Sequence, residues 1–252
     1  MPNRKPNRKP NSKPTSKQRD AIYSEEQGQL VDFAFDERVV NVFPDMIRRS
    51  VPAYETVLPL SALFAGRYVT PPATVYDLGC SRGATTLALQ RYCPAGTRII
   101  GVDNSLPMID SARDAIEDEH IEFRRDDLRT TPLEDAAAVV MTYTLQFVPP
   151  AERLALLTRI REALRPTGVF VYAEKIVLED PSEQALLNDV HLDFKRANGY
   201  SELEISQKRS ALEAVMIPES ITAHRERLAQ AGFARSIVWY RCLNWAAFAA
   251  FP

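Results

Sequence analysis

Two short segments of the chain carry residues whose types and spacing suit a nucleoside ligand. Residues 75–83 (Val-Tyr-Asp-Leu-Gly-Cys-Ser-Arg-Gly) begin like a buried strand and end in a turn with glycines at positions 79 and 83. Glycine lets a backbone turn tightly and approach a ligand closely. The second segment, residues 98–103, ends at Asp103, whose carboxylate can accept both hydroxyls of a ribose. The pair predicts a nucleoside site at the carboxyl ends of two strands.

The turn differs from a dinucleotide-binding loop, in which glycines follow the pattern G-x-G-x-x-G. Its spacing is Asp77-x-Gly79-x-Ser81-x-Gly83. Asp77 would repel a phosphate but can accept hydrogen bonds from the ammonium of an amino acid, directly or through water. The segment resembles the first motif of the class I S-adenosylmethionine-dependent methyltransferase fold, with Ser81 in place of the usual middle glycine. The alternative is an ordinary strand-turn-helix corner.

Alternating strand and helix patterns must position these residues. We predict strands near 73–79, 98–103, 121–126, 137–143 and 168–174, and helices near 83–92, 107–117 and 151–164. Residues 165–168 (Arg-Pro-Thr-Gly) are expected to stop a helix before the fifth strand. Such alternation indicates a parallel sheet that is covered on both faces.

The C-terminal third completes this fold. Residues 183–216 are expected to be helical with a break at Asn198-Gly199, and Ser201 and Glu204 have the spacing of a capping box. Two apolar, aromatic runs near 233–240 and 243–251 are expected to form an antiparallel edge. The fold class is therefore α/β: a Rossmann-like, seven-stranded, mostly parallel sheet with helices on both faces and a helical insertion near 183–216.

Ligands of such sheets bind at the carboxyl ends of the strands. We expect Asp103 and Asn104 to face the ribose and the adenine edge. Residues 126–128 (Asp-Asp-Leu) offer a carboxylate for an exocyclic amino group and an apolar side chain, Leu128, against the ring. Asp126 and Asp127 have the alternative of a solvated turn. Residues 142–146 are expected to line the reacting centre, and residues 34–70 to lie over the ligand mouth.

Charge is distributed unevenly along the 252 residues. Residues 1–19 hold seven of the 31 basic residues and no acidic residue, whereas the remainder has 24 basic against 33 acidic residues. Residues 1–30 are expected to be a disordered Asn/Lys/Pro-rich tail, and residues 31–252 to form one S-adenosylmethionine-binding domain. The acidic composition of that domain argues against direct tRNA binding. No membrane span or secretory leader is predicted, so a cytoplasmic location is expected.

Other reactive residues give weaker signals. The three cysteines are too few and too widely spaced for a disulfide framework or a zinc site, so no metal is expected. Cys80 is either a small residue beside the ligand, which we favour, or a nucleophile. The histidines at positions 120, 191 and 224 have no partner spacing for a base or a metal, and each is expected to be structural or exposed.

Several longer blocks resemble the carboxy-S-adenosyl-L-methionine synthase family. The similarity runs from about residue 33 almost to the end, and its most specific block is residues 193–210. The shorter blocks are Phe35–Arg38, Phe43–Met46, Arg49–Tyr54, Tyr76–Ser81, Asp103–Ser105 and Thr144–Phe147. The resemblance implies an enzyme that converts S-adenosylmethionine and prephenate into carboxy-S-adenosylmethionine, phenylpyruvate and water. It also implies a homodimer, and a functional link to a tRNA carboxymethyltransferase that modifies the wobble uridine.

The resemblance also implies a set of ligand contacts. Arg209 is the family position for a cation that holds the new carboxylate, and a guanidinium can pair with a carboxylate through two hydrogen bonds. Thr142 stands where the family usually has asparagine. The full set implied is Tyr54, Gly79, Cys80, Ser81, Asp103, Asn104, Asp127, Leu128, Thr142 and Arg209.

Two other functions remain open from the residues alone. One is an S-adenosylmethionine-dependent methyltransferase acting on tRNA or a small molecule. The chain lacks both the Asn/Asp-Pro-Pro-aromatic motif and the cysteine that two such classes place after the fourth strand, where it has Thr142-Tyr-Thr-Leu-Gln-Phe147. The other is a non-catalytic cofactor-binding partner of a tRNA-modifying enzyme.

Overall fold

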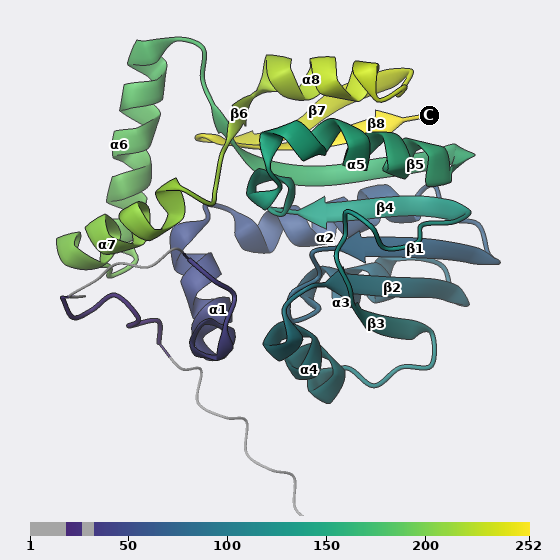
Figure 1. Cartoon of the computed structure of the whole chain (residues 1–252), viewed down its shortest axis with the longest axis horizontal. Helices are drawn as coiled ribbons and strands as arrows, with labels where there is room; N and C mark the ends of the chain where they lie inside the picture. The colour runs from purple at the N-terminus through teal and green to yellow at the C-terminus, as the bar shows by residue number, and fades with distance from the viewer. Residues whose placement is uncertain (1–18, 27–32) are drawn as a thin grey trace, which may run out of the picture.

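A mixed sheet forms the centre of the computed structural model, which describes residues 19–26 and 33–252 (Figure 1). Its strands follow the order β3-β2-β1-β4-β5-β8-β7, and a two-residue strand, β6, pairs with β5. Only β8 runs antiparallel to its neighbours on this path, β5 and β7. The strands are β1 (Ala73–Leu78), β2 (Thr97–Asp103), β3 (Ile121–Arg125), β4 (Ala136–Thr142), β5 (Leu164–Val177), β6 (Glu219–Ser220), β7 (Arg235–Cys242) and β8 (Trp245–Phe251). The predicted seven-stranded α/β fold is confirmed.

Helices cover both faces of the sheet and one of its ends. The segments predicted as helices are helical, with ends within two residues of the expected ones in α3, α4 and α5. The helical insertion is split in two, and the predicted capping box begins its second half. The helices are α1 (Glu37–Ser50), α2 (Tyr54–Gly66), α3 (Ala84–Tyr92), α4 (Leu106–Ala115), α5 (Pro150–Ala163), α6 (Pro181–Ala197), α7 (Glu202–Glu213) and α8 (Ile221–Gln230).

Two details differ from the sequence analysis. Residues 165–168 were expected to separate a helix from the fifth strand, but β5 already begins at Leu164. The pairing of β4 with β5 shifts register between Ala136 and Ala138, which accommodates Pro166 and Gly168 within the strand. The side chain of Arg165 also pairs with Asp135 at 2.6 Å. In addition, no element was predicted for residues 217–232, which contain β6 and α8.

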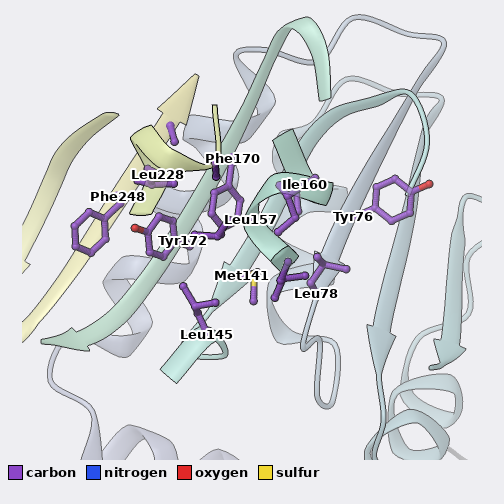
Figure 2. Packing of buried hydrophobic residues seen from close by; sticks show 14 of the residues in the cluster. Tyr76, Leu78, Met141, Leu145, Leu157, Ile160, Phe170, Tyr172, Leu228 and Phe248 are labelled. Atoms are coloured by element: carbon purple, nitrogen blue, oxygen red, sulfur yellow. The ribbon is translucent and has the colours of Figure 1, made fainter. Parts of the chain in front are cut away.

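Apolar residues fill both faces of the sheet because its central strands are buried on each side. Every residue of β4 from Ala136 to Met141 is buried. On one face, Leu157 and Ile160 of α5 and Leu228 of α8 pack against Met141 and its neighbours (Figure 2). On the other face, α2 and α3 contribute Ala62, Ala65 and Leu89 to a second cluster. The core therefore fixes the strand ends, from which the loops of the site emerge.

Three helices stand beyond one end of the sheet and cover the carboxyl ends of the parallel strands. These are α1, α6 and α7 (Figure 1). The carboxylates of Asp36 and Asp180 and the hydroxyl of Ser201 accept backbone N–H groups at their first turns, and such caps satisfy donors that have no partner inside the helix. Residues 34–70, expected over the ligand mouth, supply α1 and α2.

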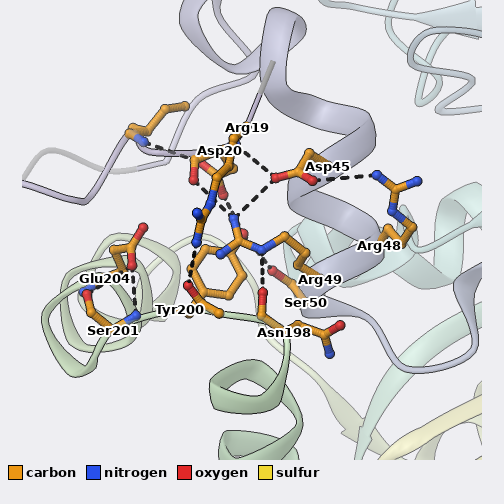
Figure 3. Close-up of polar contacts among 12 residues, drawn as sticks. Arg19, Asp20, Asp45, Arg48, Arg49, Ser50, Asn198, Tyr200, Ser201 and Glu204 are labelled. Atoms are coloured by element: carbon orange, nitrogen blue, oxygen red, sulfur yellow. Dashed lines mark hydrogen bonds and ion pairs between the residues drawn. The ribbon is translucent and has the colours of Figure 1, made fainter. Parts of the chain in front are cut away.

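The tail expected over residues 1–30 lies partly outside the described residues, but residues 19–26 are described and pack on this helical cover. Asp20 is 1% exposed. Its backbone N–H donates to Asp45 of α1 at 2.9 Å, and its carboxylate accepts from the hydroxyl of Tyr200 (Figure 3). Arg49 donates to the carbonyl of Asp20 at 3.1 Å and lies over the Tyr200 ring at 3.9 Å. Residues 19–26 are thus part of the folded domain, because Asp20 pairs with Lys208 and accepts a hydrogen bond from Arg49.

We expect Asp20→Asn to destabilise the protein by about 3 kcal/mol, because Lys208, 6% exposed and 3.6 Å from the carboxylate, would lose its counter-ion. Equilibrium unfolding in denaturant measures the change in the free energy of unfolding. Asp36→Asn is the matched control, since asparagine also caps a helix and the Arg38 pair of Asp36 is exposed. Removal of residues 1–18 should leave the unfolding free energy unchanged. Equal losses for the two Asn variants would contradict the assigned role of Asp20.

Candidate active site

A cavity of about 770 Å³ lies between the strand ends and the helical cover. This volume is in the range of sites for drug-sized ligands and cofactors. Nine of the ten site residues predicted from the sequence line it, namely Tyr54, Gly79, Cys80, Ser81, Asp103, Asn104, Asp127, Leu128 and Thr142. They come from the start of α2 and from the ends of β1, β2, β3 and β4.

The turn after β1 forms the floor of the cavity through a close backbone contact. Gly79 has a φ of +79°, and a Cβ at this position would lie 2.3 Å from the side chain of Thr144. Only glycine fits here. Ser81 also has a positive φ, of +49°, the conformation that favours the glycine usual at this position. Its backbone N–H donates to Asp103 at 2.8 Å, which fixes the strained turn against β2.

Asp103 ends β2 with both carboxylate oxygens directed by backbone donors. One oxygen accepts from the N–H of Ser81 at 2.8 Å and the other from the N–H of Ser105 at 2.9 Å. Each oxygen keeps a further lone pair that can accept a ribose hydroxyl. Burial raises the pKa of Asp103, and the two N–H donors oppose that rise. The carboxylate is therefore held in a fixed orientation before a ligand arrives.

Glu174 of β5 holds the turn after β4 in place. It is fully buried, and its carboxylate accepts the backbone N–H groups of Thr144, Leu145 and Gln146 at 3.2, 2.8 and 3.0 Å. These residues enter the short 3-10 helix Leu145–Phe147, which lies where the reacting centre was expected. Glu174 was not singled out in the sequence, because a glutamate inside an apolar strand gives no local signal of its partners.

Asp77 does not line the cavity. Its side chain is fully buried, accepts from the hydroxyl of Thr86 at 2.6 Å, and has one oxygen, Oδ1, without a partner among the described residues. Burial, with a smaller contribution from the charge of Asp103, raises its pKa to about 7. A contact with the ammonium of a ligand would supply the missing donor, and the expectation of such a contact stays a prediction.

The cysteine and histidine environments indicate structural roles. Burial, and next the charges of Asp77 and Asp103, raise the pKa of Cys80 well above its usual value, which disfavours a nucleophilic thiolate. His191 lines the cavity, but its Nε2 lies 2.8 Å from the carbonyl of Ser50 and burial lowers its pKa to about 3. His224 is buried near Tyr172, and His120 is half exposed.

Aromatic side chains give the cavity an apolar wall. Tyr54 and Tyr143 lie 6.1 Å apart between ring centroids, and Tyr143 meets Trp245 edge-on at 5.1 Å. Phe35 and Phe147 form a further edge-on pair at 5.4 Å. All five line the cavity. Such a wall excludes water and accepts an adenine or a second apolar ring.

Four of the predicted positions differ in their relation to the cavity. Arg209 is exposed on α7 and is not among the cavity-lining residues of this chain. Thr142 lines the cavity, and its hydroxyl accepts a hydrogen bond from Thr85 at 3.2 Å, so its own hydroxyl hydrogen can still be donated. Asp126 does not line the cavity, whereas Asp127 does, and Arg129 pairs with Asp127 at 2.6 Å. The pairing lowers the pKa of Asp127.

Sequence reasoning missed three cavity cations, Lys175 of β5, Lys195 of α6 and Lys208 of α7. A signal was present. After Lys17 these are the only lysines in the chain, and every other lysine-or-arginine position is an arginine. The pattern emerges only when lysine and arginine are counted separately.

Within residues 19–26 and 33–252, no helix combines the length and apolar composition needed to cross a membrane. The same residues contain no group of three or more histidine, cysteine, aspartate or glutamate side chains arranged to hold a metal ion.

Comparison with known proteins shows strong similarity over almost the whole chain. Carboxy-S-adenosyl-L-methionine synthase of Pseudomonas putida (strain W619) is 47% identical over 244 residues, which cover 93% of this chain and 99% of the relative. The proteins of the same name from Geobacter sp. (strain M21) and Pasteurella multocida (strain Pm70) are 48% and 47% identical. They cover 92% and 90% of this chain, and 98% and 96% of their own lengths.

More distant similarities concern the fold. A family model described as a methyltransferase domain matches residues 75–168. Human N-acetylserotonin methyltransferase superimposes with a TM-score of 0.60 at 19% identity, covering 85% of this chain and 55% of that protein. A putative O-methyltransferase from Nostoc punctiforme also gives 0.60, at 15% identity, covering 86% of this chain and 59% of that protein.

We expect Asp103→Asn to weaken S-adenosylmethionine binding, because hydrogen bonds to a charged acceptor contribute about 1.5–3 kcal/mol each. Isothermal titration calorimetry measures the affinity. Asp126→Asn is the matched control: it removes a neighbouring strand-end carboxylate that lies outside the cavity, and asparagine can still accept from the N–H of Asp127. Unchanged affinity in a folded Asp103→Asn protein would contradict the assignment of Asp103 to the ribose.

Proposed function

Because the chain belongs to the carboxy-S-adenosyl-L-methionine synthase family, we propose that its cavity binds S-adenosylmethionine together with prephenate and joins the methyl carbon of the first to a carboxylate of the second. The observation that carries this proposal is 47% identity over 93% of the chain and 99% of the relative. A methyltransferase-like sheet alone would support many reactions.

The strand ends are the proposed binding surface for S-adenosylmethionine. Asp103 and Asn104 would contact the ribose and the adenine edge, and Asp127 and Leu128 the adenine. Gly79, Cys80 and Ser81 would contact the amino-acid part, with Tyr54 and Thr142 near the sulfonium. Two features of the site suit this ligand. A Cβ at Gly79 would collide with Thr144, and Oδ1 of Asp77 is a buried acceptor that has no donor among the described residues.

The proposed reaction balances in atoms and charge. The sulfonium methyl loses a proton and becomes an ylide, while prephenate loses carbon dioxide and hydroxide as its ring becomes aromatic and leaves phenylpyruvate. The ylide carbon then bonds to the carbon dioxide, and the proton and hydroxide form water. The cavity would contribute by holding the two reactants in contact and by excluding water, which would otherwise protonate the ylide.

Arg209 remains our proposed partner of the new carboxylate. Its side chain lies outside the cavity wall of the single chain, so this contact requires either a different side-chain rotamer or the second chain of a homodimer. The homodimer is implied by the family resemblance. Thr142, in place of the usual asparagine, would contact the ligand through its hydroxyl or its backbone.

The product would serve a tRNA carboxymethyltransferase that forms the 5-oxyacetyl group of wobble uridine. Transfer of a small product, without tRNA binding by this chain, agrees with the acidic composition of residues 20–252. We propose a cytoplasmic location for this role.

Mass spectrometry of the reaction with S-adenosylmethionine and prephenate tests the proposal. We expect a product whose mass exceeds that of S-adenosylmethionine by one carbon dioxide, formed in equal amount with phenylpyruvate. Prephenate labelled with ¹³C in its ring carboxylate should transfer the label. An unlabelled product, or S-adenosylhomocysteine formed on adding tRNA, would favour a methyltransferase instead.

We expect Arg209→Lys to weaken binding of carboxy-S-adenosylmethionine much more than binding of S-adenosylmethionine, because lysine keeps the charge but loses the two-pronged contact with a carboxylate. Calorimetry with both ligands measures the difference. Arg196→Lys is the control, because Arg196 pairs with Asp193 and Glu202 on the outer surface. Equal losses for both ligands would remove Arg209 from the carboxylate site.

A further inference from the structure

All three lysines of residues 20–252 line one cavity. These lysines come from three separate elements: Lys175 from β5, Lys195 from α6 and Lys208 from α7. All other basic residues of 20–252, apart from the histidines, are arginines. Lysine differs from arginine in carrying a compact point charge that can lose its proton when buried. The location of all three in one cavity therefore points to a role of the ammonium group itself.

Lys208 already has a counter-ion. Its Nζ lies 3.6 Å from the carboxylate of Asp20 and donates to the hydroxyl of Ser50 at 2.9 Å and to that of Tyr200 at 3.4 Å. The Tyr200 ring centroid is 5.1 Å away. With its charge balanced and its donors occupied, Lys208 is a fixed cation of the cavity wall.

Lys175 and Lys195 have no counter-ion within the described residues. Neither forms an ion pair there, although both are largely removed from water. A buried charge without a partner is costly, and proteins normally pair it. His191 lies one turn before Lys195 and does not compensate, because it is a neutral imidazole at physiological pH. The cavity thus contains two positive charges that its own wall leaves unbalanced.

The positive charges around the cavity repel one another. Burial, followed by the charges of Lys208, Lys175 and Arg209, lowers the pKa of Lys195 to about 7. Burial and the charge of Arg209 lower the pKa of Lys175. A ligand with two negative charges would remove this repulsion, whereas S-adenosylmethionine brings a sulfonium and an ammonium against one carboxylate.

We propose that Lys175 and Lys195 form the anion subsite of the cavity and bind the two carboxylates of the second substrate, while Lys208 remains paired with Asp20. The inference rests on the proposed function and deepens it. It assigns binding of the dicarboxylate to residues of β5 and α6, and binding of the nucleoside to the ends of β1, β2 and β3. It also implies selection of dianions over monoanions.

Steady-state kinetics of Lys175→Gln and Lys195→Gln test the subsite. At saturating S-adenosylmethionine, each variant should raise the KM for prephenate by at least about tenfold, since each loses a charge-assisted hydrogen bond. The dissociation constant of S-adenosylmethionine should change by less than about twofold. Arg196→Gln, the adjacent position on α6 that faces outward to Asp193 and Glu202, should change neither quantity. An unchanged KM, or an equal loss of S-adenosylmethionine affinity, would overturn the proposal.

A binding experiment separates this inference from the proposed reaction. Prephenate is titrated calorimetrically into protein saturated with S-adenosylhomocysteine, which has no methyl group to react, and phenylpyruvate serves as the monoanion. We expect prephenate to bind at least about tenfold more tightly than phenylpyruvate in the parent protein, and this preference to disappear in the lysine variants. If the parent forms no carboxylated product but shows this preference, the subsite stands and the reaction is wrong. If it forms the product without the preference, the subsite is wrong.

The same titration has a pH signature. The ammonium form of Lys195 binds an anion and the neutral amine does not, so a pKa near 7 makes prephenate affinity fall as the pH rises from about 7 to 9. Binding should also take up protons, which calorimetry in buffers of different ionisation enthalpy detects. Lys195→Gln should remove most of this dependence. A parent protein with a flat profile and no proton uptake would contradict the participation of Lys195.

Discussion

The buried carboxylate of Glu174 supports the floor of the cavity. It accepts three successive backbone N–H groups of the turn after β4, and so places Thr144 against Gly79. That contact leaves no room for a Cβ and determines the path of the turn after β1. Ser81 then reaches Asp103. A single acceptor in an apolar strand thus fixes the relative positions of the loops after three strands, because unsatisfied N–H groups at that depth would be costly.

The roof of the cavity depends on a different kind of interaction. Here α1, α6 and α7 meet through charged groups that are mostly buried, with Arg49 stacked on Tyr200 and bonded to the carbonyl of Asn198 at 2.7 Å (Figure 3). Asp20 brings the N-terminal segment into this network. Because buried cations need counter-charges, the segment helps to determine that Lys208 is balanced, whereas Lys175 and Lys195 are left for a ligand.

The floor and the roof therefore carry groups of opposite charge that suit different parts of the ligands. Carboxylates at the strand ends are suited to the hydroxyl and amino groups of a nucleoside. The cations on β5, α6 and α7 are suited to anions, which a transfer of a methyl group alone would not require. In the proposed arrangement, a fold common to many enzymes would accommodate a carboxylate-bearing second substrate through Lys175 and Lys195.

The sequence determined the sheet, its turn and the capping box of α7, because these depend on local patterns. Gly79, Ser81 and Asp103 follow from the strand-turn-helix spacing, and α7 begins at the Ser201–Glu204 box as predicted. Local patterns could not place Asp20, which bonds to a tyrosine 180 residues away. Nor could they distinguish Lys208 from its neighbour Arg209, because adjacent residues of a helix point about 100° apart. Only tertiary packing decides which of the two lines the cavity, and only packing brings Lys175 and Lys195 together there without a counter-ion among the residues described.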